Sequence, residues 1–276
     1  MLAAERRDFL LARLRSEGKV VAKDIAAEIG VAEDNIRRDL RELASAGLCT
    51  RVYGGALPAA PAAADYATRT TVAPDSKHRV ALAAVGLIRP GSTVLLDGGT
   101  TALALAAALP PDLAATIVTH SVTVAAALVT HPAVEVQVIG GRLFKHSAVT
   151  SGAAAAEALS RVSADLFFLG VTGVHHRAGL TTGDADEAAM KRLLASRAAE
   201  TYVLASAEKI GAASPFEVLP LSSVAGIITD VPADDAELRR LAESGIDVIL
   251  RPPSRYGGPP TPSQGQPERG RPGVAQ

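Results

Sequence analysis

An alternation of short apolar runs with helical stretches through residues 75–250 constrains this fold more than any other feature of the sequence. The apolar runs predict strands at 93–96, 116–119, 134–139, 165–169, 201–205, 225–229 and 247–250. Helices are expected around them, at 77–88, 102–109, 122–129, 153–160, 187–200 and 234–243. Strands that are apolar on both faces and separated by helices are typical of a mostly parallel sheet covered on both sides. The pattern therefore predicts a Rossmann-like α/β domain.

The composition narrows the class of protein further. The chain has 276 residues, a formal net charge of −1 and one Cys. That length allows one large domain and a small one, and a single Cys excludes a disulfide framework or a cysteine-rich zinc site. The longest charge-free stretch, 113–134, is interrupted by two histidines, a serine and a proline, so no membrane span is expected. Residues 1–7 lead into a charged helix rather than a secretory signal, which favours a cytoplasmic protein.

Changes in composition divide the chain into four parts. Residues 1–57 are mixed in charge and helical in pattern, and 58–75 form a linker that starts with a Pro/Ala run. Residues 76–251 hold the predicted α/β domain. Residues 252–276 contain seven Pro and five Gly in 25 positions and have no apolar periodicity, so the sequence predicts a disordered tail.

The first part, residues 1–57, has the order of elements of a winged helix-turn-helix. A first helical stretch is followed by a short extended entry at 20–21, a helix over 24–29 and a tight turn at Gly30. A third helix from about 33 to 46 precedes a strand at 48–52 and a Gly-Gly turn. The last two of these helices form the helix-turn-helix pair, and in such a pair the second helix, here the one from about 33 to 46, enters the major groove of DNA.

The third helix carries side chains suited to reading DNA. Ile36, Leu40 and Leu43 recur at helical spacing and are expected to be buried. The outward side then presents polar and charged residues: Asp34, Asn35, Arg37, Arg38 and Arg41. Arginine pairs with guanine edges and asparagine with adenine, while the same arginines are equally able to hold phosphates.

The charges of this region leave two interpretations open. Arg51 and Tyr53 lie where a wing would touch the DNA backbone, which favours DNA binding. However, residues 33–53 contain four acidic residues against four arginines. Counted by charge alone, the region is also compatible with a three-helix packing module that has a solvated charged face.

The literal sequence favours DNA binding. The run Ile-Arg-Arg-Asp-Leu at 36–40 and the run Arg-Val-Tyr-Gly-Gly-Ala at 51–56 resemble the DeoR family of bacterial transcriptional regulators. The resemblance implies double-stranded operator DNA as a partner, and paired half-sites imply a homo-oligomer, a dimer or a tetramer. Ala32, Asn35 and Tyr53 depart from the residues that the family favours, so the operator sequence does not follow from the resemblance.

A second group of polar residues lies where the predicted strands end. Strand 93–96 runs into Asp-Gly-Gly-Thr-Thr at 97–101, and a helix begins directly after it. Glycines let a backbone approach an anion, and threonine hydroxyls and helix N-terminal N–H groups hold it. The next two strands end in polar or glycine-rich runs at 119–121 and 140–142, at the edge where parallel sheets bind ligands. The alternative at 97–101 is an ordinary tight turn.

Charged residues later in the chain complete the predicted site. Glu187, Lys191 and Lys209 are expected to reach it, because a phosphate favours Lys or Arg and a polyol favours carboxylates. Gly170, Gly173 and the run 179–182 are expected in flexible loops. The predicted effector-binding residues are Asp97, Gly98, Gly99, Thr100, Thr101, Thr119, Ser121, Gly141, Glu187, Lys191 and Lys209.

The family resemblance extends through residues 76–230. It rests on Ser76-Lys77, the Asp-Gly-Gly-Thr-Thr run, Gly179-Leu180-Thr181 and the charged residues just named. It implies a DeoR-type sensor domain, similar in fold to sugar-phosphate isomerases and CoA transferases, that binds a phosphorylated sugar or a related metabolite. His120 departs from the family pattern. We therefore expect a repressor of carbohydrate-metabolism genes, with no catalytic residues and no cofactor.

An isomerase is the alternative function. Two carboxylates of the acidic loop Asp184–Glu187 and a lysine could move a proton next to a carbonyl, as aldose–ketose isomerisation requires. A helix follows at once, and carboxylates are favoured at helix N-termini in any case, so the helix-entry interpretation is preferred. The pair His175-His176 is expected in an exposed loop without a metal, because adjacent histidines point apart and no third ligand is evident.

Overall fold

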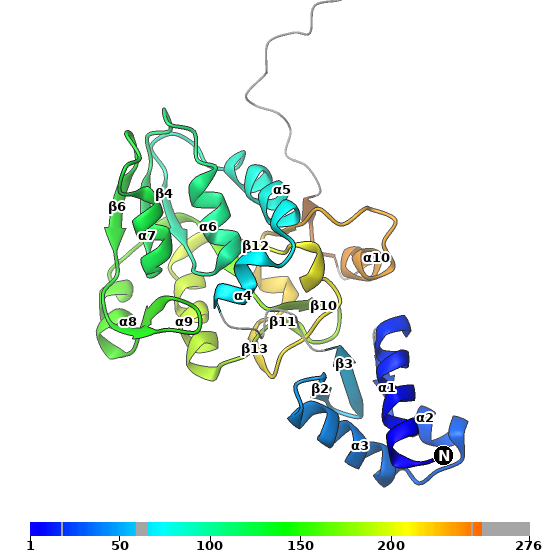
Figure 1. The fold of residues 1–276 in the computed structure, drawn as a ribbon. Helices are drawn as coiled ribbons and strands as arrows, with labels where there is room; N and C mark the ends of the chain where they lie inside the picture. Colours follow the sequence, from blue (N-terminus) through cyan, green and yellow to red (C-terminus); the bar gives the residue numbers. More distant parts are fainter. Residues whose placement is uncertain (18, 59–65, 244, 250–276) are drawn as a thin grey trace, which may run out of the picture.

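The N-terminal region is a winged helix-turn-helix in the computed structural model, which describes residues 1–17, 19–58, 66–243 and 245–249 (Figure 1). Its helices are α1 (Ala3–Glu17), α2 (Ala22–Ile29) and α3 (Glu33–Ser45). Its strands β1 (Val20–Val21), β2 (Cys49–Val52) and β3 (Gly55–Pro58) pair antiparallel in the order β1-β3-β2. The predicted winged helix-turn-helix fold is confirmed.

Apolar periodicity explains how these helices pack. Leu10 and Leu14 of α1 lie against Ile36 and Leu40 of α3 in one buried cluster. The wing needs glycine at its turn, because a Cβ on Gly55 would lie 1.8 Å from the Val20 carbonyl oxygen of the neighbouring strand. The Gly-Gly pair therefore permits β1 and β3 to approach each other.

The larger region is built on a parallel sheet. Seven strands of the described chain are hydrogen-bonded in the order β15-β14-β12-β9-β4-β5-β6, and every neighbouring pair is parallel. The strands are β4 (Thr93–Leu96), β5 (Thr116–Thr119), β6 (Glu135–Val138), β9 (Ala164–Gly170), β12 (Ala198–Leu204), β14 (Gly226–Ile228) and β15 (Val248–Ile249). Strand order reverses direction between β4 and β9. The predicted Rossmann-like α/β class is confirmed.

Helices cover both faces of this sheet. Leu95 and Phe167 pack on one face with α8 (Ala153–Ser160), α9 (Ala185–Ala195) and α10 (Ala236–Glu243). Their sequence neighbours Leu96 and Phe168 pack on the other face with α5 (Pro74–Val85), α6 (Thr100–Ala107) and α7 (Val122–Leu128). Since successive strand residues point to opposite faces, the continuous apolar runs are what a doubly covered sheet requires.

Smaller antiparallel elements were not predicted. The strands β10 (Gly173–His175), β11 (Gly179–Thr182) and β13 (Phe216–Leu219) form a sheet of their own, and β7 (Arg142–Phe144) pairs with β8 (Val149–Ser151). The expectation of flexible loops at 179–182 is therefore wrong, because these residues are buried in β11. The helix expected over 187–200 is too long, since α9 ends at Ala195 and β12 begins at Ala198.

Two sequence expectations concern residues that the structure does not describe. The predicted disordered tail, 252–276, lies outside the described residues, as does the 59–65 part of the linker. The remainder of the linker includes helix α4 (Tyr66–Thr71). Among the described residues, no helix is both long and apolar enough to cross a bilayer.

Candidate functional site

A cavity lies at the carboxyl ends of the parallel strands, beside the point where strand order reverses between β4 and β9. Ligands of open α/β sheets bind at this position. The residues that line the cavity come from α4, α5, the loop after β4, β9, α9 and the segment after β12. They are Arg69, Val72, Lys77, Gly98, Gly99, Thr100, Thr101, Ser147, Gly170, Val171, Thr172, Thr182, Glu187, Lys191, Glu208 and Lys209.

The loop after β4 brings backbone close to this cavity. Gly99 is the N-cap of α6 with φ +96°, a conformation that favours glycine. A Cβ on Gly98 would lie 2.1 Å from a Val149 methyl, so a side chain there would displace the β7–β8 hairpin. The N–H groups of the first turn of α6 and the Thr101 hydroxyl therefore face the cavity, an arrangement that suits an anion.

Cationic side chains outnumber acidic ones on the cavity wall. The cations are Arg69, Lys77, Lys191 and Lys209, and the acids are Glu187 and Glu208. Lys209 Nζ donates to Thr101 Oγ1 at 3.0 Å and to the Leu204 carbonyl at 3.2 Å. Because an ammonium has three donors, one N–H of Lys209 remains for a ligand.

Burial sets the protonation of the cavity lysines. Burial lowers the pKa of Lys209 to about 8, an effect that nearby Glu208 opposes and that Lys77 and Lys191 reinforce. Burial also lowers the pKa of Lys77, whose Nζ donates to the Arg69 and Val72 carbonyls. An anion bound between them would favour their charged forms.

Asp97 lies beneath the cavity rather than on its wall. Its side chain is fully buried, Oδ1 accepts from Gly98 N–H at 2.7 Å, and Oδ2 accepts from Gly170 N–H at 2.9 Å. Lys191 Nζ lies 2.6 Å from Oδ2. Burial alone would raise the pKa of Asp97, but Lys191 and His120 outweigh it and hold the pKa well below its usual range. Asp97 is thus a buried anion that positions Lys191 and the glycine loop.

His120 completes the buried charge network. Its Nε2 lies 2.9 Å from Asp97 Oδ1, and its Nδ1 lies 3.0 Å from the Thr150 carbonyl oxygen. Since both partners are acceptors, hydrogen bonds on both sides require a proton on each ring nitrogen. The departure from the family pattern at this position therefore places an imidazole ring between Asp97 and the Thr150 carbonyl.

Glu187 and Lys191 connect α9 to the cavity. Lys191 Nζ lies 3.4 Å from Glu187 Oε1, and Thr182 donates to Glu187 Oε2 at 2.8 Å. Burial would lower the pKa of Lys191, but Asp97 and Glu187 raise it overall. Burial would raise the pKa of Glu187, yet Lys191 and Thr182 lower it overall. Both groups are therefore charged on the cavity wall.

The structure brings together only part of the predicted effector set. Gly98, Gly99, Thr100, Thr101, Glu187, Lys191 and Lys209 line the cavity, whereas Asp97, Thr119, Ser121 and Gly141 do not. Thr119 donates to the Leu96 carbonyl, and Ser121 caps α7 by accepting from Val124 N–H. Sequence reasoning missed Arg69 and Thr172 and assigned no role to Lys77. Arg69 lies in the short linker helix and Thr172 in the segment between β9 and β10, where no periodic signal marks them, and the helical pattern around Lys77 does not show that its side chain lines the cavity.

The acidic loop Asp184–Glu187 forms the N-terminus of helix α9. Asp184 is the N-cap of α9, and its Oδ1 accepts from Glu187 N–H at 2.9 Å. Asp186 is exposed in the first turn of the same helix. The preferred helix-entry interpretation of this run matches the geometry, and the pair of carboxylates is not held as a proton-transfer site.

The outer face of α3 and the wing, which the sequence predicts to read DNA, has a different distribution of charge. Glu33 pairs with Arg37 at 2.7 Å, and Asp39 and Glu42 turn toward α1, where they pair with Arg6 and Arg7. Among the described residues, Arg38, Arg41 and Arg51 form no ion pair, and all three are exposed together with Asp34 and Tyr53, while Asn35 is half-buried. The outer face of α3 and the wing therefore does not show the equal balance of four acidic residues and four arginines that residues 33–53 have in the sequence.

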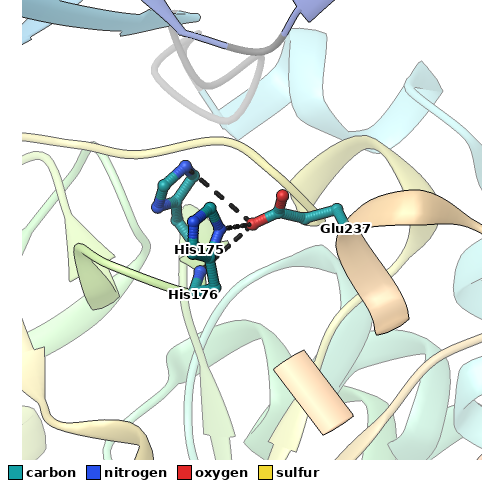
Figure 2. A group of neighbouring side chains, drawn as sticks. All are labelled: His175, His176 and Glu237. Carbon is teal, nitrogen blue, oxygen red and sulfur yellow. Dashed lines mark hydrogen bonds and ion pairs between the residues drawn. The ribbon is translucent and has the colours of Figure 1, made fainter. Parts of the chain in front are cut away.

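His175 and His176 do not lie in an exposed loop, which corrects the sequence interpretation. His175 ends β10 and is 2% exposed, and Figure 2 shows both rings directed at Glu237 of α10. His176 Nδ1 lies 2.6 Å from Glu237 Oε1, and His175 Nε2 lies 3.9 Å from it. Glu237 is thus a third possible metal ligand beside the two histidines, and the sequence did not reveal it.

The tautomer of His175 nevertheless argues against a metal in this cluster. Its Nδ1 accepts from the N–H groups of Arg177 and Ala178 at 3.0 and 3.3 Å. Burial lowers the pKa of His175 to about 4, so the neutral ring keeps its proton on Nε2, the nitrogen that a metal would need. Arg240 also lies 3.0 Å from Glu237 Oε2. The cluster joins the β10–β11 turn to α10 by hydrogen bonds.

Comparison with known proteins matches both regions to one family. Residues 6–60 match the DeoR-like helix-turn-helix domain, and residues 72–231 match the DeoR C terminal sensor domain. The putative aga operon transcriptional repressor of Escherichia coli O157:H7 is 33% identical, over 90% of this chain and 93% of that protein. The regulator GlpR of Haloferax volcanii is 31% identical, over 90% of this chain and 98% of that protein. Ribose 5-phosphate isomerase A of Methanocaldococcus jannaschii matches 49% of this chain and 54% of its own chain with 19% identity and a TM-score of 0.37.

Proposed function

Because this chain belongs to the DeoR family of transcriptional regulators and is not an enzyme, we propose that it represses carbohydrate-metabolism genes and responds to a phosphorylated sugar. The phosphorylated sugar would bind in the cavity beside β4 and β9. Operator DNA would bind α3 and the wing of a homo-oligomer, because paired half-sites require paired helices.

The cation-rich cavity is the observation that carries this proposal. Lys77 and Lys209 each have a donor left after their hydrogen bonds to protein oxygens. Both face the same cavity as the N-terminus of α6. A phosphate group fits these donors, and Glu187 and Glu208 supply acceptors for sugar hydroxyls.

The residues proposed to contact DNA have separate roles. Asn35 and Arg38 would face base edges from the N-terminal half of α3, and Arg41 would do so from the following turn, with Asp34 and Arg37 beside them. Arg51 and Tyr53 of the wing would contact the phosphate backbone. Tyr53 is fully exposed at the tip of the wing, a position suited to that contact.

Thermal-shift measurements test the effector site. A panel of pentose and hexose phosphates is compared with the same sugars lacking the phosphate. A ligand at 100 times its Kd should stabilise the protein by about 2.7 kcal/mol. We expect stabilisation by at least one phosphorylated sugar, its loss in Lys209→Met, and its retention in the exposed-site control Lys145→Met. Equal stabilisation by the unphosphorylated sugars would contradict a phosphate site.

Gel shifts test the DNA-reading face on the promoter upstream of the chain's own gene. Arg38→Ala should weaken binding by about 1–3 kcal/mol if the side chain reads a base. Arg239→Ala, an exposed arginine of α10, is the matched control and should leave binding unchanged. An unaltered Kd for Arg38→Ala would remove this residue from the interface.

A further inference from the structure

The wing is hydrogen-bonded to the sensor region in this structure. Thr50 of β2 donates from Oγ1 to the Ala213 carbonyl oxygen at 2.8 Å. Arg177 and Ala178 of the β10–β11 turn line a groove together with wing residues of β2 and β3. Figure 1 shows these wing strands next to β10, β11 and β13. The base of the wing therefore contacts the small antiparallel sheet, while its tip stays exposed.

The segment 209–214 connects this contact with the effector cavity. It begins at Lys209, whose side chain lines the cavity, and it contains Ala213, which accepts from Thr50. Next to Ala213, Ser214 Oγ lies 2.6 Å from Oγ1 of Thr172, another cavity residue. A ligand in the cavity would therefore contact the segment directly at Lys209 and indirectly through the hydrogen bond between Thr172 and Ser214.

Tight packing prevents this segment from absorbing a displacement. Gly211 N–H donates to the Val174 carbonyl at 2.8 Å, and Ser214 N–H donates to Thr181 Oγ1 at 2.9 Å. A Cβ on Gly173 would lie 2.4 Å from the Ala212 carbonyl oxygen, so β10 and the segment are in direct backbone contact. Close-packed interiors transmit small shifts rather than damping them.

We propose that the segment 209–214 is the coupling element of this regulator, which passes occupancy of the cavity to the wing through the Thr50–Ala213 hydrogen bond. The proposal rests on the proposed function, since it assumes that the cavity binds an anion. Thr50 directly precedes Arg51 in β2, so a change at Thr50 repositions a residue proposed to contact DNA. Coupling requires that the ligand favour one arrangement of this contact over another.

Hydrogen exchange with inorganic phosphate as the probe tests this coupling in the full chain. In the wild type, phosphate should slow amide exchange at 98–101 and change exchange in the wing, 49–58, by about fivefold or more, the lower end of ordinary coupling. Thr50→Val removes the hydroxyl and should abolish the wing response while leaving protection at 98–101. Thr50→Ser keeps the hydroxyl and should retain both. Thr130→Val, at an exposed site, is the control.

The outcomes separate the two proposals. If phosphate leaves 98–101 unprotected, the anion site and with it the coupling are wrong. If 98–101 is protected but the wild-type wing does not respond, only the coupling is wrong. If Thr50→Val still responds, the signal travels through the linker, where α4 places Arg69 on the cavity wall, and the segment 209–214 is not the coupling element.

Discussion

The cavity proposed to bind the effector and the face of α3 proposed to read DNA differ in how they hold charge. Lys191 lies on the cavity wall, whereas Asp97 and His120 do not line the cavity; all three side chains are buried, and each is held by several partners. On α3, the pair Arg37–Glu33 is exposed, and Arg38 and Arg41 have no ion-pair partner among the described residues. The buried charges are held in place by protein partners, whereas the exposed ones remain accessible for the proposed contacts with DNA. Removing a buried charge beside the cavity should therefore lower the free energy of unfolding more than removing an exposed charge on α3.

Removing the buried carboxylate should have the largest effect. Asp97→Ala leaves Lys191 and His120 without their shared anion, and breaking a buried pair costs about 3–5 kcal/mol of the free energy of unfolding. Urea denaturation measures this loss. Because Asp97 does not line the cavity, the expected result is instability rather than a simple loss of ligand contact. A change below about 1 kcal/mol would mean that the charge network is not formed.

The pH dependence of phosphate binding should follow Lys209. Its pKa of about 8 in the folded protein lies below the ordinary lysine value of 10.5, so the ammonium proposed to hold a phosphate loses its charge as pH rises through 8. Losing a charge-assisted hydrogen bond should weaken binding by about 1.5–3 kcal/mol. Calorimetric titration at pH 7 and pH 9.5 measures this. Lys209→Met should bind weakly at both and should lose less affinity between them than the wild type, because only Lys77, whose pKa burial also lowers, then remains to titrate. The unfolded chain binds more protons between the two pKa values, so Lys209 makes stability rise with pH there.

Asp39 is a buried charged residue on α3, whose other charged residues are more exposed. It belongs to α3 but is 3% exposed and pairs with Arg6 of α1. Since Arg6 keeps some contact with solvent, Asp39→Ala should cost about 1–2 kcal/mol of the free energy of unfolding. Chemical denaturation of the variant tests this value. A cost as large as that of Asp97→Ala would show that the two regions do not differ in how they hold charge.

The exposed helix pair should have the smallest effect. Arg37 and Glu33 are 54% and 37% exposed at the side chain. An i,i+4 pair at such exposure contributes about 0.5 kcal/mol or less. Arg37→Ala should therefore leave the free energy of unfolding almost unchanged, and added salt should remove the remaining difference. A loss above about 1 kcal/mol would contradict the view that α3 displays its charges for DNA.

Local patterns were enough to predict most helices and the strands of the parallel sheet, but not the cavity. Ile36, Leu40 and Leu43 recur at helical spacing, and the structure buries all three. Thr93–Leu96 and Thr116–Thr119 were predicted with the bounds of β4 and β5. In contrast, β10, β11 and β13 are too short for a local period to mark them, and β11 pairs with β13 across a wide gap in the sequence.

The sequence by itself determined the class of this protein, because apolar periodicity and the Ile-Arg-Arg-Asp-Leu and Asp-Gly-Gly-Thr-Thr runs are local features. Tertiary structure decided which polar residues meet. Asp97 and Lys191 are 94 residues apart, and Lys209 and Thr101 are 108 residues apart. Asp97 became a buried support and Thr172 a cavity residue only when β4, β9 and α9 packed together. Burial then set the pKa of Lys209, which depends on neighbours that no local pattern reveals.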